Sequence, residues 1–270
     1  MISPTEIYHY RRAQFTPAHP TIPIIANLPH SGLNIPDDMR KQLKPEYQNF
    51  LPNQDWHLQH LYNFLPELGI STLQATHSRY AADLNRELTG EPYGSFWKSI
   101  IPEQTAYKIP LYDITLSAQQ IQHQLNSFYH PYHQKLAQVL QQQVALFGQV
   151  LLLDLHSFGA FVDNEVILGD AKNTSCDASI FNTLTQCFTD RDFDVVQNKV
   201  FTGGHITRHY SKNPGIQAIQ IELRYELYLE EDALKENSVP TWQGTRFDQV
   251  QNRLRAVFES LCTQLKIVQG

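Results

Sequence analysis

The chain has 270 residues, of which 41% are hydrophobic, and it carries a formal net charge of −6 at pH 7. This length and composition allow a large buried core and predict a single domain over residues 1–270, or one domain with a small insertion. The acidic balance and the lack of a basic run argue against nucleic acid or an anionic membrane as the main partner. A small-molecule substrate stays open, and the sequence gives no indication of the oligomeric state.

The cysteines and the N-terminal residues indicate in which cellular compartment the protein is expected. Cys176, Cys187 and Cys262 are odd in number and lack CxxC spacing, so they suggest neither a disulfide framework nor a thiolate zinc site. The segment MISPTEIYHYRRAQF has no apolar signal core, and the sequence contains no apolar run long enough to span a membrane. We therefore expect a soluble protein of the reducing cytoplasm.

Short β-rich runs alternate along the chain with segments of helical periodicity. This alternation predicts an α/β fold with a mixed, largely parallel central sheet flanked by helices. Ser117 is expected to cap one helical stretch, and Pro131 to kink or divide it. In chain order we expect a strand at 21–28, a helix at 55–68, a strand at 69–78, a helical stretch at 117–147, strands at 149–157, 165–170, 192–200 and 216–225, and a last helix at 245–267.

The segment 87–114 breaks this alternation. It is rich in proline, glycine and aromatic residues and shows no sustained period. Long ordered loops in compact domains are commonly functional, so we expect it to cross one face of the sheet and to contribute to function.

Polar side chains lie where several apolar runs end. The carboxyl ends of parallel strands gather at one edge of a sheet, and ligands bind in the crevice outside them. Two imidazoles, a carboxylate able to act as a base and several guanidinium groups suit metal-assisted hydrolysis of an anionic substrate. The residues at these strand ends are His30, Arg79, Asn85, Arg86, Asp154, His156, Glu222 and Arg224.

A catalytic zinc ion needs three protein ligands and an open position, and histidine and carboxylate are the usual ligands other than thiolate. His30 and His156 are the first candidates for Zn²⁺ or a similar divalent metal. The third ligand is Asp55 or His57, and we prefer Asp55 because two histidines with one carboxylate form a common hydrolytic set. Asp154 is expected to accept a hydrogen bond from a ligand imidazole and so to fix its orientation.

Each candidate also has a structural explanation. A single histidine among twelve is more often structural than a ligand, and DLNR at 83–86 could be a turn with an ion pair. An unpaired carboxylate on a buried strand is costly, so a purely structural role is harder to assign to Glu222, although it could pair with Arg224 or Arg208.

The sequence lacks HExxH, GxSxG and GxxxxGK[ST], which excludes thermolysin-type, serine-hydrolase and P-loop sites.

Six motifs occur along the chain in the order NLPHSGLNIP, DWHLQHLYNF, SRYAADLNR, LLLDLHSFG, LGDAKNTSC and GGHITRHYSKNPGIQAIQIELR. Together they resemble the N-formylglutamate amidohydrolase family over about residues 20–265. That family is similar to zinc carboxypeptidases and aspartoacylases, so the resemblance implies a zinc-carboxypeptidase-like fold. It also implies hydrolysis of N-formyl-L-glutamate to formate and L-glutamate, a step of histidine degradation.

The resemblance also implies residue roles. Glu222 would be the general base and Arg79 the group that polarises the scissile carbonyl. Asn85 and Arg86 would hold one substrate carboxylate. Because guanidinium forks suit carboxylates, we expect Arg208 or Arg224 to hold the other. His30 and His156 would be metal ligands.

One position departs from the carboxypeptidase pattern, which has a glutamate three residues after the first ligand histidine. Here that residue is Leu33, so the middle ligand must come from elsewhere, and Asp55 is the inferred choice. Two alternatives stay open: hydrolysis of another N-acyl amino acid or a small peptide, and a non-catalytic protein that binds metal or an amino acid. The presence of Glu222 argues against the second, since binding alone needs no base.

Overall fold

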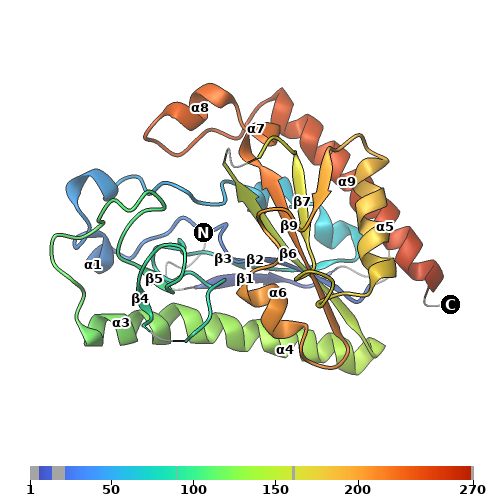
Figure 1. Cartoon of the computed structure of the whole chain (residues 1–270), viewed down its shortest axis with the longest axis horizontal. Helices are drawn as coiled ribbons and strands as arrows, with labels where there is room; N and C mark the ends of the chain where they lie inside the picture. Colours follow the sequence, from blue (N-terminus) through green and yellow to red (C-terminus); the bar gives the residue numbers. More distant parts are fainter. Residues whose placement is uncertain (1–5, 14–21, 90, 160–161, 269–270) are drawn as a thin grey trace.

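A seven-stranded mixed sheet forms the centre of the molecule (Figure 1). The computed structural model describes residues 6–13, 22–89, 91–159 and 162–268, so position 21 of the predicted first strand and Gly90 of the predicted loop lie outside the described residues. The strand order is β1 (Tyr8–Arg11), β3 (Ser71–Ala75), β2 (Ile24–Leu28), β6 (Val150–Phe158), β9 (Ile216–Arg224), β7 (Val166–Gly169) and β8 (Val195–Gln197).

The sheet is largely parallel, as predicted. Strand pairs β2–β3, β2–β6, β6–β9 and β7–β8 are parallel, whereas β1–β3 and β7–β9 are antiparallel. A separate pair of short parallel strands, β4 (Tyr93–Gly94) and β5 (Ile101–Pro102), lies within the 87–114 excursion.

Helices cover both faces of the sheet (Figure 1). α4 (His130–Phe147) packs on one face, and α5 (Ala178–Thr189) and α9 (Thr245–Val268) pack on the other. The shorter helices are α1 (Asp37–Arg40), α2 (Leu58–Leu61), α3 (Ala118–Gln124), α6 (His205–Tyr210), α7 (Tyr225–Tyr228) and α8 (Glu231–Lys235), with 3₁₀ turns η1 (Pro45–Tyr47) and η2 (Leu65–Leu68). Among the described residues, no helix combines the length and apolar character needed to cross a membrane.

Successive residues of the central strand β6 face opposite layers, as side chains of a strand must. Leu151, Leu153 and Leu155 belong to the core beneath α5 and α9. Val150 and Leu152 belong to the core beneath α4. The strand is therefore buried on both faces, which explains its continuous apolar run.

The predicted helical stretch at 117–147 is one continuous run of helical backbone that contains a π-helical turn (Figure 1). Ser117 caps α3 through a capping box with Gln120. A π-helical turn, η3 (Leu125–Tyr129), separates α3 from α4, and Pro131 lies in the first turn of α4. The π-helical turn directly precedes Pro131, which lacks the N–H that an uninterrupted α-helical ladder would need at this position.

Two predicted elements are wrong in extent. The helix expected over 55–68 is reduced to α2 and η2, because His57 adopts a left-handed φ of 57° and Pro66 lies in a 3₁₀ turn. Its apolar period reflects burial of Leu58 and Leu61 against the sheet, not a continuous helix. The strand expected over 192–200 shortens to β8, and β1 was not predicted at all.

Candidate active site

The carboxyl ends of β6 and β9 bring four polar side chains to one face of the sheet. The parallel register sets Asp154 beside Gln220 and His156 beside Glu222. In β9, Ile219, Ile221 and Leu223 belong to the core beneath α5 and α9. Alternation therefore turns Gln220 and Glu222 to the opposite face, where Asp154 and His156 also lie.

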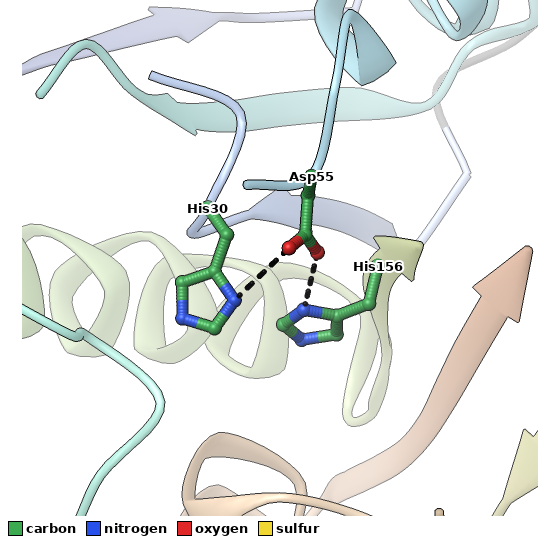
Figure 2. Close-up of side chains that lie close together, drawn as sticks. All are labelled: His30, Asp55 and His156. Carbon is green, nitrogen blue, oxygen red and sulfur yellow. Dashed lines mark hydrogen bonds and ion pairs between the residues drawn. The ribbon is translucent and has the colours of Figure 1, made fainter. Parts of the chain in front are cut away.

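His30, Asp55 and His156 form a compact buried cluster (Figure 2). His30 follows β2, Asp55 precedes α2, and His156 lies near the end of β6. His30 Nδ1 is 3.6 Å from Asp55 Oδ1, and His156 Nδ1 is 3.0 Å from Asp55 Oδ2. All three ligand atoms lie within 4.8 Å of one another. His30 Nδ1 is buried and makes no hydrogen bond with any described residue, which fits an atom oriented to bind a cation.

The outer nitrogen of each imidazole faces a second carboxylate. His30 Nε2 is 2.7 Å from Asp83 Oδ1, and His156 Nε2 is 3.1 Å from Asp154 Oδ2. Such carboxylate–histidine pairs fix the imidazole orientation and leave Nδ1 for a metal. The sequence predicted a partner role for Asp154 but missed Asp83, whose only signal was its place at the start of DLNR.

The alternative middle ligand, His57, points elsewhere. Its Nε2 lies 2.6 Å from the carbonyl oxygen of Pro240, and its ring lies between those of Trp56 and Trp242. The candidate cluster therefore contains Asp55 and not His57.

The charges in the cluster depend on one another. Burial alone would raise the pKa of Asp55, but His30 and His156 hold it well below the usual range. Burial alone would lower the pKa of His156, but Asp154 and Asp55 raise it well above its ordinary value. The two carboxylates thus favour positive charge at the His156 imidazole, and a divalent cation bound at Nδ1 would meet the same preference.

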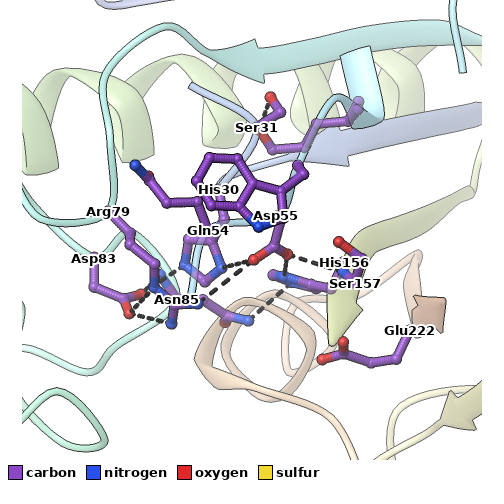
Figure 3. A network of polar contacts seen from close by, with 12 residues as sticks. His30, Ser31, Gln54, Asp55, Arg79, Asp83, Asn85, His156, Ser157 and Glu222 are labelled. Atoms are coloured by element: carbon purple, nitrogen blue, oxygen red, sulfur yellow. Dashed lines mark hydrogen bonds and ion pairs between the residues drawn. The ribbon is translucent and has the colours of Figure 1, made fainter. Parts of the chain in front are cut away.

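Asp83 also contacts two arginines, and Figure 3 shows Arg79 beside it. Arg79 Nη2 lies 2.6 Å and Arg86 Nη2 lies 3.4 Å from Asp83 Oδ2. Burial would raise the pKa of Asp83, but Arg79, Arg86 and His30 hold it well below its usual range. Arg79 also approaches Asp55 Oδ1 at 3.5 Å, so it links this group to the metal cluster.

Asn85 has both ends of its amide engaged by the protein. Its Oδ1 accepts a hydrogen bond from Ile206 N at 2.8 Å, and its Nδ2 lies 3.4 Å from Asp154 Oδ2 and 3.1 Å from His156 Nε2. Asn85 is therefore in contact with the candidate metal centre, where it supports Asp154 and His156.

A cavity of about 600 Å³ joins these groups. The 87–114 excursion forms one wall with Phe96, Trp97, Ala106 and Tyr107. The remaining lining includes the three cluster residues together with Arg79, Asn85, Arg86, Arg208, Gln220 and Glu222.

Glu222 is buried in this cavity, and burial raises its pKa to about 8 despite the nearby His156 and Arg79. A carboxyl group with such a pKa can both accept and donate a proton near neutral pH. The described residues give its Oε2 no hydrogen bond, while Oε1 accepts one from Gln220.

The two candidates for the second carboxylate differ in position. Arg208 lines the cavity, and no hydrogen bond or ion pair links its guanidinium to another described residue. Arg224 is not among the lining residues: its Nε lies 3.0 Å from Glu226 Oε2, and its Nη1 donates to the carbonyl of Asp163 at 2.9 Å. The structure thus brings Arg208, but not Arg224, to the site.

The sheet and the cavity define an α/β protein with a candidate metal centre and a buried carboxylate in one cavity, a set of groups that suits a hydrolase. The chain belongs to the N-formylglutamate amidohydrolase family, whose sequence pattern matches residues 22–229.

Two curated relatives support this assignment. The N-formylglutamate deformylases of Pseudomonas aeruginosa and Pseudomonas putida are 34% and 33% identical to the chain over 224 and 223 residues. Each alignment covers 78% of this chain, and they cover 84% and 83% of the relatives.

Solved structures share the fold. N-formylglutamate amidohydrolase from Ralstonia eutropha JMP134 matches with a TM-score of 0.73 and 22% identity, over 94% of this chain and 96% of that one. A gene product from Agrobacterium tumefaciens matches with a TM-score of 0.72 and 14% identity, over 97% of both chains.

Proposed function

We propose that this chain hydrolyses N-formyl-L-glutamate to formate and L-glutamate. The observation that carries the proposal is that Glu222 and the His30–Asp55–His156 cluster line one cavity in a chain of this family. Both curated relatives are named N-formylglutamate deformylase. The reaction would be a step of histidine degradation in the cytoplasm, carried out on a small anionic substrate by a single domain.

The cluster fits a divalent cation such as zinc. His30 Nδ1, a carboxylate oxygen of Asp55 and His156 Nδ1 would hold it, since all three already converge. Bound there, the cation would supply Lewis-acid chemistry, activating the nucleophile and polarising the acyl carbonyl. Asp83 and Asp154 would hold the two imidazoles in the required tautomer.

The proton transfers fall to Glu222. Its carboxylate would accept a proton from the attacking water and deliver it to the leaving amine nitrogen, so that one group serves as base and then as acid. A pKa raised to about 8 by burial suits a group that must do both. Arg79 would face the oxyanion that forms on the carbonyl oxygen, because Asp83 and Asp55 fix its guanidinium beside the cluster.

The substrate carboxylates would be held by arginines of the cavity wall. Arg86 lines the cavity, and its buried Nε makes no hydrogen bond with a described residue. Arg208 offers to the same cavity a guanidinium that has no hydrogen-bond or ion-pair partner among the described residues. It is the better candidate for the second carboxylate, since Arg224 is engaged by Glu226. The Asn85 amide could also bind a substrate carboxylate, but only by giving up its contacts with Asp154 and Ile206 N.

Release of the free amino acid from a panel of N-formyl and larger N-acyl amino acids, together with metal analysis of the purified protein, tests the proposal. We expect N-formyl-L-glutamate to be the best substrate and about one zinc to be bound per chain. Faster release of a larger acyl group would assign the site to another N-acyl amino acid. Turnover of no member of the panel would contradict hydrolysis by this site.

A further inference from the structure

Gln220 is a buried side chain of the cavity that the mechanism above does not use. It lies two residues before Glu222 on β9, so alternation places both on the same face. Its Nε2 donates a hydrogen bond to Glu222 Oε1 at 2.8 Å. Its Oε1 accepts a hydrogen bond from Gly204 N, just before α6.

The orientation of this amide is fixed by chemistry. A backbone N–H can only donate, so the side-chain oxygen of Gln220 must face Gly204. The NH₂ group then has to face Glu222, whose Oε1 accepts its hydrogen bond. The arrangement engages Oε1 of Glu222 and leaves Oε2 without a hydrogen bond from the described residues.

The start of α6 supports this arrangement together with Asn85. Ile206 N donates to Asn85 Oδ1, as Gly204 N donates to Gln220 Oε1. A Cβ atom at position 204 would collide with the Asn85 amide, so only glycine lets both amides reach the backbone. One short segment of backbone thus orients two amides, one beside Asp154 and His156 and the other beside Glu222.

We propose that Gln220 is a positioning residue that holds the Glu222 carboxylate in one rotamer, with Oε2 turned to the reacting water. This inference rests on the proposed role of Glu222 as the base. A carboxylate on a side chain with several rotamers loses proton-transfer efficiency when its position is not fixed, because the acceptor must lie within hydrogen-bond reach of the proton. The hydrogen bond from Gln220 acts only through Glu222.

The test is a double-mutant cycle with Gln220→Met and Glu222→Gln, measured on whichever acyl amino acid the wild type turns over fastest. Methionine keeps the length of glutamine but neither hydrogen bond. We expect Gln220→Met to lower kcat about 10- to 100-fold, the range for losing one hydrogen bond to a charged group. We expect KM to change less than about two-fold and bound metal to stay at the wild-type level, because neither depends on the rotamer of Glu222.

The cycle separates positioning from a general structural role. In the Glu222→Gln background, Gln220→Met should lower kcat no further, because the group on which it acts is gone. A crystal structure of Gln220→Met should show Glu222 in a shifted or divided rotamer with the rest of the cavity unchanged.

Gln217→Met provides a matched control. Gln217 lies on the same strand, but its amide bonds Asp177 at the start of α5, away from the cavity. This variant should keep wild-type kcat. Should Gln220→Met fail to fold, Gln220→Glu replaces it, since this change keeps an acceptor for Gly204 N and removes the donor to Glu222; it too should lower kcat at least 10-fold.

Three results would overturn the inference: wild-type kcat in a folded Gln220 variant, an equal loss of kcat in both backgrounds, or an equal loss in Gln217→Met. These outcomes differ from a failure of the proposed substrate, which would show as a different best substrate for the wild type. A wild type that hydrolyses nothing in the panel would overturn both.

Discussion

The site is built in two halves that are held in different ways. The strand-borne half, Asp154 and His156 on β6 with Gln220 and Glu222 on β9, is fixed by a parallel ladder between two buried strands. The loop-borne half, 79–86, lies outside the sheet and is held by charge. Asp83 there contacts Arg79, Arg86 and His30. The difference teaches that backbone register positions Glu222 and His156. The buried carboxylate of Asp83 instead orients the arginines of the loop and the His30 imidazole.

The largest expected effect falls on the strand-borne half. Glu222→Gln keeps the shape of the side chain and should retain the fold and the metal. Turnover should fall about 100- to 10,000-fold, the usual contribution of a general acid or base. Formate release at equal metal content is the measurement. Near-normal turnover would move the base to His205 or His209, and a variant that fails to fold would make Glu222 a structural residue.

In the loop-borne half, the main expected effect of a substitution is a lower free energy of unfolding. Asp83→Asn leaves Arg79 and Arg86 as buried cations without their main partner. Removing one member of a buried charge pair costs about 3–5 kcal/mol, so the free energy of unfolding should drop by about that amount. Denaturant unfolding checks this. Asp113→Asn, at an exposed surface pair with Lys44, is the control and should stay within about 0.5 kcal/mol of wild type. Equal changes in both variants would contradict the central place of Asp83.

The halves also differ in how much of them could be predicted from sequence. Alternation along 216–225 separates Glu222 from the apolar face of its strand, and the end of the apolar run at 149–157 singles out His156; the pairing register then sets the two side by side. The same rule puts Arg224 on that face, but β9 ends there and Arg224 pairs with Glu226. Alternation therefore does not predict that Arg224, the last residue of β9, lies outside the cavity.

The loop-borne half was only partly predictable. Arg79, Asn85 and Arg86 were singled out, but Asp83 was missed, because its role depends on His30, which lies 53 residues away in sequence. The choice of Asp55 over His57 depends on the left-handed turn at His57, which no apolar period indicates. Long-range charge contacts and local backbone turns leave no periodic trace in a sequence.

Substrate binding should distinguish Arg208 from Arg224. Arg208→Ala should raise KM about 10- to 100-fold, as expected for loss of a hydrogen bond to a charged group, with metal content unchanged. Arg224→Ala should leave KM close to wild type, because its guanidinium pairs with Glu226 outside the cavity. Steady-state kinetics on the two variants decide between them. A larger effect at Arg224 would reverse the assignment.

A smaller effect concerns the helix that supports the loop-borne half. His133 on α4 contacts the carbonyl of Leu84 at 3.0 Å, and burial lowers its pKa to about 3. Between the unfolded value of about 6.5 and this lower value, the unfolded chain binds more protons, so stability falls as the pH falls through that window. His133→Gln should flatten this dependence by up to about 1.4 kcal/mol per pH unit.

Unfolding free energies at pH 6, 5 and 4 would show this change in slope. Gln134→Ala, at an exposed neighbour on the same helix, is the control and should keep the wild-type slope. An unchanged slope in His133→Gln would mean that this imidazole is not buried in its neutral form.

The central claim, that the two halves form one metal-dependent hydrolytic site, is tested most directly by titrating metal-free protein with zinc while measuring formate release from N-formyl-L-glutamate. The account predicts that activity rises in proportion to bound zinc and saturates at about one ion per chain, because His30, Asp55 and His156 form one ligand set. Formate release that is independent of zinc, or no release at full occupancy, would contradict it.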